Sequence, residues 1–213
     1  MTKVIEWDQI EYPEFDYQAL LACLKSYSQP RRKINQLLKS GDIVRVKKGI
    51  YVFGPALQKS PASTLKLANL VYGPSYVSYE TALAFYGLIP ESVPCVISST
   101  PIRKKIFETP MGAFLYEKIS FAQFEGQFQI LDHGMSGTIL VATREKALVE
   151  KMWRQRKNLP ESSQEMEAYL FDDLRLDEDL FRKLRPSRIK ELYQVFPHKS
   201  IGYLGDFLKR MKK

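Results

Sequence analysis

Basic and amide side chains gather in a short segment near the amino terminus of this 213-residue chain. Arginine hydrogen-bonds guanine, asparagine and glutamine hydrogen-bond adenine, and lysine binds phosphate as a point charge. This set of side chains predicts contact with double-stranded DNA. The candidate DNA-binding residues are Arg31, Arg32, Lys33, Asn35, Gln36, Lys39, Arg45, Lys47 and Lys48.

Apolar spacing predicts the helices that present the first of these side chains. Positions 16–25 and 30–40 have helical periodicity, with Asp16 as the cap of the first helix and Gly41 closing the second. On an ideal wheel the second helix has an apolar stripe formed by Ile34, Leu37 and Leu38. The opposite face consists of Arg32, Gln36 and Lys39, flanked by Lys33 and Asn35. A solvated surface helix has the same appearance, so this helix alone leaves both interpretations open.

The period then changes to the alternation of a β-hairpin over positions 44–53, with Gly49 in the turn. Val44 and Val46 are expected to face one way, and Arg45 and Lys47 the other. Helix, turn, helix and hairpin are the order of a small winged helix-turn-helix unit. A basic hairpin beside the helix favours DNA binding, in which it would contact the DNA backbone. A charged hairpin also discourages strand pairing, and both roles are compatible.

The positive charge of the chain is concentrated in this unit. The whole chain has a net charge of +8, and positions 16–54 hold eight bases against two acids, a net charge of +6. Such concentration is expected of a phosphate-binding surface. No apolar run approaches the roughly 18 residues of a membrane span, and the first residues include acids that a signal peptide would lack. We therefore expect a cytoplasmic protein without a membrane partner.

The remaining chain mixes strands with helices. The predicted strands are CVISST, FLYEKIS, FQILD and TILVA, and the predicted helices cover 64–71, 78–85 and 143–154, followed by a helical tail over 166–174, 180–184, 189–195 and 204–211. The expected fold class is α+β, with an N-terminal winged helix-turn-helix at 1–57 and a mixed α/β C-terminal domain with a helical tail at 58–213. Positions 54–63 are predicted to form an exposed linker that proteases cut first.

The sequence lacks the residue sets of an enzyme or a metal site. Cys23 and Cys95 form no CxxC pair, and we expect both to be small buried side chains. The GMSG run at 134–137, next to His133, lacks the strand-to-helix turn of a hydrolase serine. We expect no catalytic activity, no metal and no cofactor.

Three stretches resemble the AbiEi family of antitoxins: KINQLLKSGDIVRVKKGIYVFG at 33–54, YGPSYVSYETALAFYGLIPESV at 72–93, and VATREKALVEKMW at 141–153. The resemblance implies a transcriptional autorepressor that binds inverted repeats in its own promoter. It also implies a type IV toxin-antitoxin system, whose partner is an AbiEii-type nucleotidyltransferase toxin that forms no stable complex with the antitoxin. Two features depart from the family: only two helices precede the wing, and Arg144 stands where a proline is expected.

A second basic cluster lies in the helical tail and is a candidate antitoxin or partner surface. It comprises Arg182, Lys183, Arg185, Arg188 and Lys190. These charges would also serve simply to balance the acids at 172–179 and keep the tail solvated. The alternative function for the chain is therefore an antitoxin or regulatory module that contacts an acidic protein partner without specific DNA binding. Steep salt dependence through counterion release is the property expected of the DNA-binding function.

Overall fold

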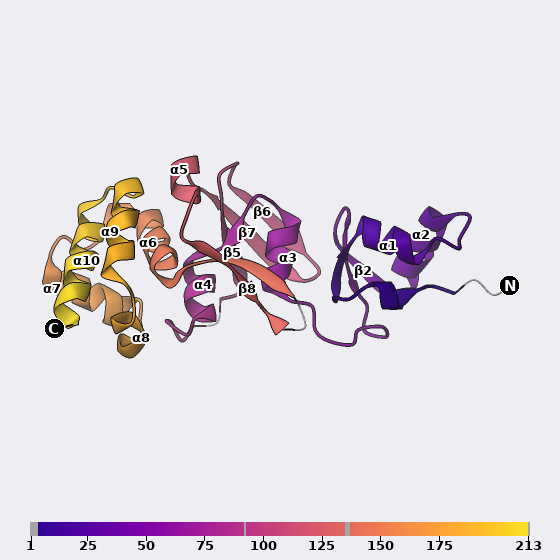
Figure 1. The fold of residues 1–213 in the computed structure, drawn as a ribbon, viewed down its shortest axis with the longest axis horizontal. Helices are drawn as coiled ribbons and strands as arrows, with labels where there is room; N and C mark the ends of the chain where they lie inside the picture. Colours follow the sequence, from indigo (N-terminus) through magenta and orange to yellow (C-terminus); the bar gives the residue numbers. More distant parts are fainter. Residues whose placement is uncertain (1–3, 92, 135–136, 213) are drawn as a thin grey trace.

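The computed structural model describes residues 4–91, 93–134 and 137–212. The fold is α+β, as predicted, with helices and two separate β-sheets. Figure 1 shows an elongated molecule with a small amino-terminal unit at one end, a larger sheet in the middle and a helical layer at the other end.

The amino-terminal unit combines two helices with a three-stranded sheet. Its elements are β1 (Glu14–Asp16), α1 (Tyr17–Cys23), α2 (Pro30–Ser40), β2 (Ile43–Lys47) and β3 (Ile50–Phe53). The Asp16 carboxylate caps α1 by accepting a hydrogen bond of 2.8 Å from the Ala19 amide. Gly41 closes α2 at a φ of +77°, a conformation that glycine adopts without strain. The predicted helices and hairpin are therefore confirmed. Strand β1, which pairs with β3, was not predicted.

The small sheet is buried on both faces, and it divides two hydrophobic cores. Ile43 and Tyr51 point towards α1 and α2 and belong to the core of the amino-terminal unit. Val46 and Val52 point the other way and belong to the core of the rest of the molecule. Because side chains alternate along a strand, one hairpin supplies residues to both cores. The hairpin therefore connects the two parts of the protein directly.

Polar contacts reinforce this junction beside the segment 54–63. The buried Glu14 carboxylate accepts a hydrogen bond from the Ser63 amide. The Lys66 ammonium lies 3.5 Å from the centre of the Tyr12 ring. Exposed residues of the segment remain the predicted site of first cleavage, but the contacts on both sides are expected to hold the two fragments together after a cut.

The larger part contains a six-stranded mixed sheet in the order β6-β7-β5-β4-β9-β8. Its elements are α3 (Thr64–Val71), β4 (Tyr76–Val77), α4 (Tyr79–Phe85), β5 (Cys95–Thr100), β6 (Lys105–Thr109), β7 (Gly112–Lys118), α5 (Phe121–Phe124), β8 (Phe128–Asp132) and β9 (Thr138–Ala142). Strand pairs β5–β7 and β4–β9 are parallel, whereas the other neighbouring pairs are antiparallel. All four predicted strands are present. Strands β4 and β6 and helix α5 were not predicted.

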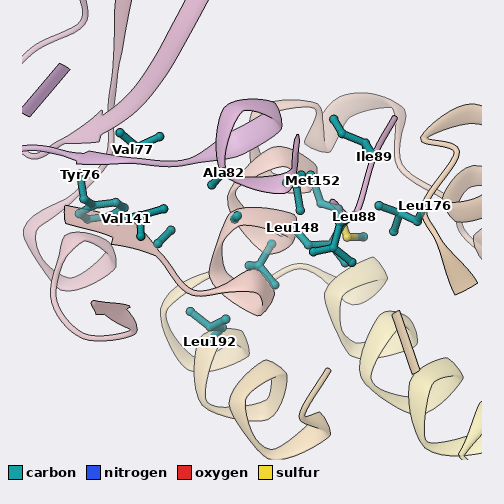
Figure 2. Packing of buried hydrophobic residues seen from close by; sticks show 14 of the residues in the cluster. Tyr76, Val77, Ala82, Leu88, Ile89, Val141, Leu148, Met152, Leu176 and Leu192 are labelled. Carbon is teal, nitrogen blue, oxygen red and sulfur yellow. The ribbon is translucent and has the colours of Figure 1, made fainter. Parts of the chain in front are cut away.

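Helix α6 (Arg144–Arg154) begins at the predicted cap Thr143, whose hydroxyl accepts a hydrogen bond from the Lys146 amide. The tail follows as α7 (Ser163–Ala168), a π-helical turn (Tyr169–Asp173), α8 (Glu178–Arg182), α9 (Pro186–Val195) and α10 (Lys199–Met211). In Figure 2 the apolar side chains of Leu148 and Met152 lie between α4 and the tail helices. Sheet, α6 and tail share one hydrophobic core, and α6 is its central element.

Candidate nucleic-acid interface

Helix α2 presents most of the candidate DNA-binding side chains to solvent. Ile34 and Leu37 are buried against the amino-terminal core, as the wheel predicts. The exposed candidates on this helix are Arg31, Arg32, Asn35, Gln36 and Lys39. Lys33 is half-buried, with its ammonium 5.6 Å from the centre of the Tyr27 ring. The polar face of α2 is thus an accessible surface of arginine, lysine and amide groups.

A groove separates α2 from the β2–β3 hairpin. The hollow has a volume of about 710 Å³ and is lined by four of the candidate residues: Arg31, Asn35, Arg45 and Lys48. Apolar side chains, among them Leu38 and Tyr51, form its floor. Within the part of the chain that the structure describes, the lining contains no carboxylate. Phosphate or base edges entering the groove would therefore meet cations and one amide on both walls.

Lys47 does not share this surface, in contrast to the predicted alternation. The register of β2 on β3 shifts between Arg45 and Lys47, which is the signature of a β-bulge. A bulge adds one residue to its strand, so Lys47 leaves the face of Arg45 and turns towards the larger part of the molecule. Its ammonium donates a hydrogen bond of 2.5 Å to the Val71 carbonyl and lies 4.8 Å from the centre of the Phe107 ring. Burial, together with the nearby charge of Lys105, lowers the pKa of Lys47.

The two stretches 72–93 and 141–153 meet in a buried polar network. The fully buried Glu150 carboxylate, on α6, accepts hydrogen bonds from the hydroxyls of Tyr76, Ser78 and Ser99. Burial raises the pKa of Glu150, while the charge of Lys146 and the three hydrogen bonds oppose that rise. The network joins α6 to strands β4 and β5.

Lys146 supports the same region from the same face of α6, one turn before Glu150. Its ammonium donates hydrogen bonds to the carbonyl oxygens of Phe124, Glu125 and Gly126 at 3.0, 3.2 and 2.6 Å. Burial lowers the pKa of Lys146 to about 8, against the opposing effect of the Glu150 charge. Lys146 thereby satisfies three carbonyls at the end of α5 and in the loop that follows it, which is a structural role.

The candidate partner surface in the tail is only partly free. Arg182, Lys183, Arg185 and Lys190 are exposed. Arg188 instead lies 3.6 Å from the buried Glu145 carboxylate, which also accepts a hydrogen bond of 2.8 Å from the Arg185 amide. Glu145 thus fixes the start of α9 on α6, and Arg188 has a structural partner.

The remaining sequence candidates show no assembled site. Cys23 is buried, whereas Cys95 is only half-buried, and both are free thiols. Ser136 of the GMSG run lies outside the described residues. His133 packs edge-on against Phe85 at 5.8 Å between ring centres. Over 4–91, 93–134 and 137–212 no group of three or more His, Cys, Asp or Glu could hold a metal ion. Among these same residues, no helix is long and apolar enough to cross a membrane.

Two features were not predicted from the sequence: the second buried face of the hairpin, and the distant residues that pair with the charged side chains of α6. A signal for the first was present, because Ile50, Tyr51, Val52 and Phe53 are all apolar, which indicates a strand buried on both sides. The charges of α6 gave no comparable signal. Alternating acids and bases in REKALVEK suit a solvated helix equally well, and only the fold brings their partners from β4, β5 and α4.

Comparison with known proteins identifies a similar fold among solved structures. No protein-family model and no curated protein matches the chain. Among solved structures, the chain is similar to the crystal structure of the RV2827C protein from Mycobacterium tuberculosis, with a TM-score of 0.62 and 14% sequence identity. The match covers 95% of this chain and 74% of the other. At this identity the likeness establishes a shared fold over nearly the whole chain.

Proposed function

We propose that the protein is a sequence-specific double-stranded DNA-binding protein with a winged helix-turn-helix at its amino terminus. The observation that carries this proposal is the groove between α2 and the hairpin, where Arg31, Asn35, Arg45 and Lys48 converge. Helix α2 would enter the major groove and read bases with Arg32, Asn35 and Gln36. Arg45 and Lys48 of the wing would bind the adjacent backbone and fix the register.

The resemblance to AbiEi antitoxins extends this proposal to a biological role. The protein would repress its own promoter at inverted repeats and act as the antitoxin of a type IV system, countering an AbiEii-type nucleotidyltransferase toxin without forming a stable complex. We assign neutralisation of the toxin to the part after position 57. Its exposed bases Lys183, Arg185 and Lys190 are available for a partner. Arg182 is exposed but contacts Glu178 and the Met211 carbonyl, and Arg188 is paired with Glu145.

Two adjacent lysines provide a sharp test of the DNA-binding surface. Lys48→Ala should weaken binding to every duplex and reduce the slope of log affinity against log salt by about 0.9, the value for one lost phosphate contact. Lys47→Ala removes the same charge one residue away. Because the Lys47 ammonium contacts Val71 and Phe107 and not the groove, this substitution should leave the slope unchanged. Fluorescence anisotropy on a labelled duplex between 50 and about 200 mM salt measures both slopes. Equal slopes for the two variants would contradict the proposed surface.

Base-reading residues should behave differently from these lysines. Arg32→Ala or Gln36→Ala should mainly erode discrimination between the cognate duplex and a random duplex, by about 1–3 kcal/mol for a lost bidentate contact. Unchanged discrimination in both variants would place the reading surface elsewhere.

A further inference from the structure

Two adjoining hollows lie beside the carboxyl end of α6, far along the chain from the DNA-binding surface. The first, of about 600 Å³, is lined by the cations Lys151, Arg154, Arg156 and Lys157 and by a single carboxylate, Asp173. The second, of about 420 Å³, is lined mostly by apolar side chains, among them Leu83, Ile89 and Ile97, together with the carboxylates Glu80, Glu91 and Asp173. Lys151, Asp173 and Leu174 belong to both linings. We call the first hollow the basic lobe and the second hollow the apolar lobe of one cleft.

Glu80 holds two of the cations in place without neutralising both. Its Oε1 atom accepts hydrogen bonds from Lys151 Nζ and Arg154 Nη2, each at 2.5 Å. The Lys151 side chain is only 9% exposed, so it is fixed at the boundary of the two lobes. Glu80 Oε2 is buried and has no hydrogen-bond partner in the structure. A buried acceptor left unpaired is costly, and this one lies in a residue that lines the apolar lobe.

Arg156 and Lys157 extend the positive charge beyond the end of α6. Among the described residues, neither has a carboxylate within salt-bridge distance. The Arg156 guanidinium lies 4.9 Å from the centre of the Trp153 ring and donates a hydrogen bond of 3.1 Å to the Trp153 carbonyl. A helix carboxyl end attracts cations by itself, which accounts for one or two of them. Against the two carboxylates Glu80 and Asp173, the four cations leave this region with a net charge of +2.

The backbone around the cleft departs from regular geometry at two places. The π-helical turn Tyr169–Asp173 contributes Tyr169 and Asp173 to the basic lobe, and such turns occur frequently at functional sites. Tyr79, immediately before Glu80, has a φ of +52°, which costs free energy in a residue other than glycine. Arg154 lies 5.0 Å from the centre of the Tyr79 ring, so this residue also positions a cation of the cleft.

We propose that this cleft binds a nucleoside phosphate. The guanidinium groups of arginine and the ammonium groups of lysine bind phosphate oxygens, and both are concentrated in the basic lobe. The apolar lobe would receive the base, and Glu80 Oε2 would accept a hydrogen bond from an amino group of that base after a small rotation. Both lobes lie within the usual size range of ligand sites. This site is independent of the proposed DNA-binding surface and uses none of its residues.

Isothermal titration calorimetry of the full-length protein at low salt tests the site. The ligands are ATP, CTP, GTP and UTP, with pyrophosphate as the phosphate-only probe. At least one nucleotide should bind, and pyrophosphate should bind at least about tenfold more weakly because it leaves the apolar lobe empty. Arg156→Ala/Lys157→Ala should weaken nucleotide binding at least about tenfold. Both side chains are exposed, and thermal melting verifies that this variant is folded.

Two matched double variants control for charge. Arg182→Ala/Lys183→Ala removes the same charge at the carboxyl end of α8, and Arg32→Ala/Lys39→Ala removes it from α2. Both should bind the nucleotide as the wild type does. Absence of binding by all four nucleotides would overturn the proposal, as would equal affinity for pyrophosphate. An equal loss in all three double variants would also overturn it, since binding would then follow net charge alone.

Discussion

Replacing Glu150 by alanine should lower the free energy of unfolding by about 3–5 kcal/mol, the range for removing one partner of a buried charged pair. The carboxylate is fully buried and accepts hydrogen bonds from Tyr76, Ser78 and Ser99. Alanine would leave three hydroxyls without their acceptor and Lys146 without its nearest opposite charge. It would also leave a cavity at the centre of the shared core.

Urea denaturation followed by circular dichroism measures this loss. Glu167→Ala is the matched control, because Glu167 is exposed on α7 and its removal should change stability by less than about 0.5 kcal/mol. A loss below about 1 kcal/mol for Glu150→Ala would mean that the hydroxyl network contributes little to joining α6 to the sheet.

Replacing Gly54 by alanine should destabilise the amino-terminal unit by about 3 kcal/mol or more, as a severe overpacking change. A Cβ atom at position 54 would lie 1.7 Å from the carbonyl oxygen of Gly41. Because this is a backbone atom, no side-chain rotation can relieve the clash. The Gly54 amide also donates a hydrogen bond of 2.8 Å to the Asp42 carbonyl, so the two chain segments cannot separate without losing this contact. Since Gly41 closes α2, the displacement should also shift the proposed DNA-binding surface.

Gly202→Ala is the control for this substitution. Gly202 lies in helix α10, where a Cβ atom would meet only Tyr193 at an ordinary distance of 3.7 Å. Alanine there should be neutral or stabilising by up to about 1 kcal/mol, because it is the better helix former. Thermal melting compares the two variants, and equal melting temperatures would show that the Gly41–Gly54 approach is not a tight constraint.

Local rules predicted the elements of the amino-terminal unit well. The cap at Asp16, the glycine at the end of α2 and the apolar stripe of α2 all depend on residues close in sequence. Such rules do not predict how the hairpin packs against distant parts of the chain. Figure 1 shows that the larger part of the molecule lies on the side of the hairpin opposite α1 and α2. The alternation placed Lys47 beside Arg45, whereas the bulge in β2 turns it away. A bulge depends on pairing with β3 and on the core behind it, so the period of β2 alone could not reveal it.

The charged helix α6 illustrates a second limit. Its sequence identifies a helix and its cap, but a buried Glu150 looks the same as a solvated one until its partners are known. Those partners come from residues more than 50 positions away in sequence. Similarly, the cleft beside α6 gathers Glu80, Lys151 and Asp173 from three separate elements, and no local motif predicts that convergence.

Sequence-specific reading of DNA by α2 and the hairpin, as we propose, should appear as a difference in affinity between duplexes. A mobility-shift titration of the full-length protein, with competitor DNA present, should be made on the duplex upstream of its own gene and on a random duplex of equal length. We expect the upstream duplex to bind at least about 10³-fold more tightly, the lower end for specific DNA-binding proteins. Equal affinity for the two duplexes would contradict sequence-specific recognition.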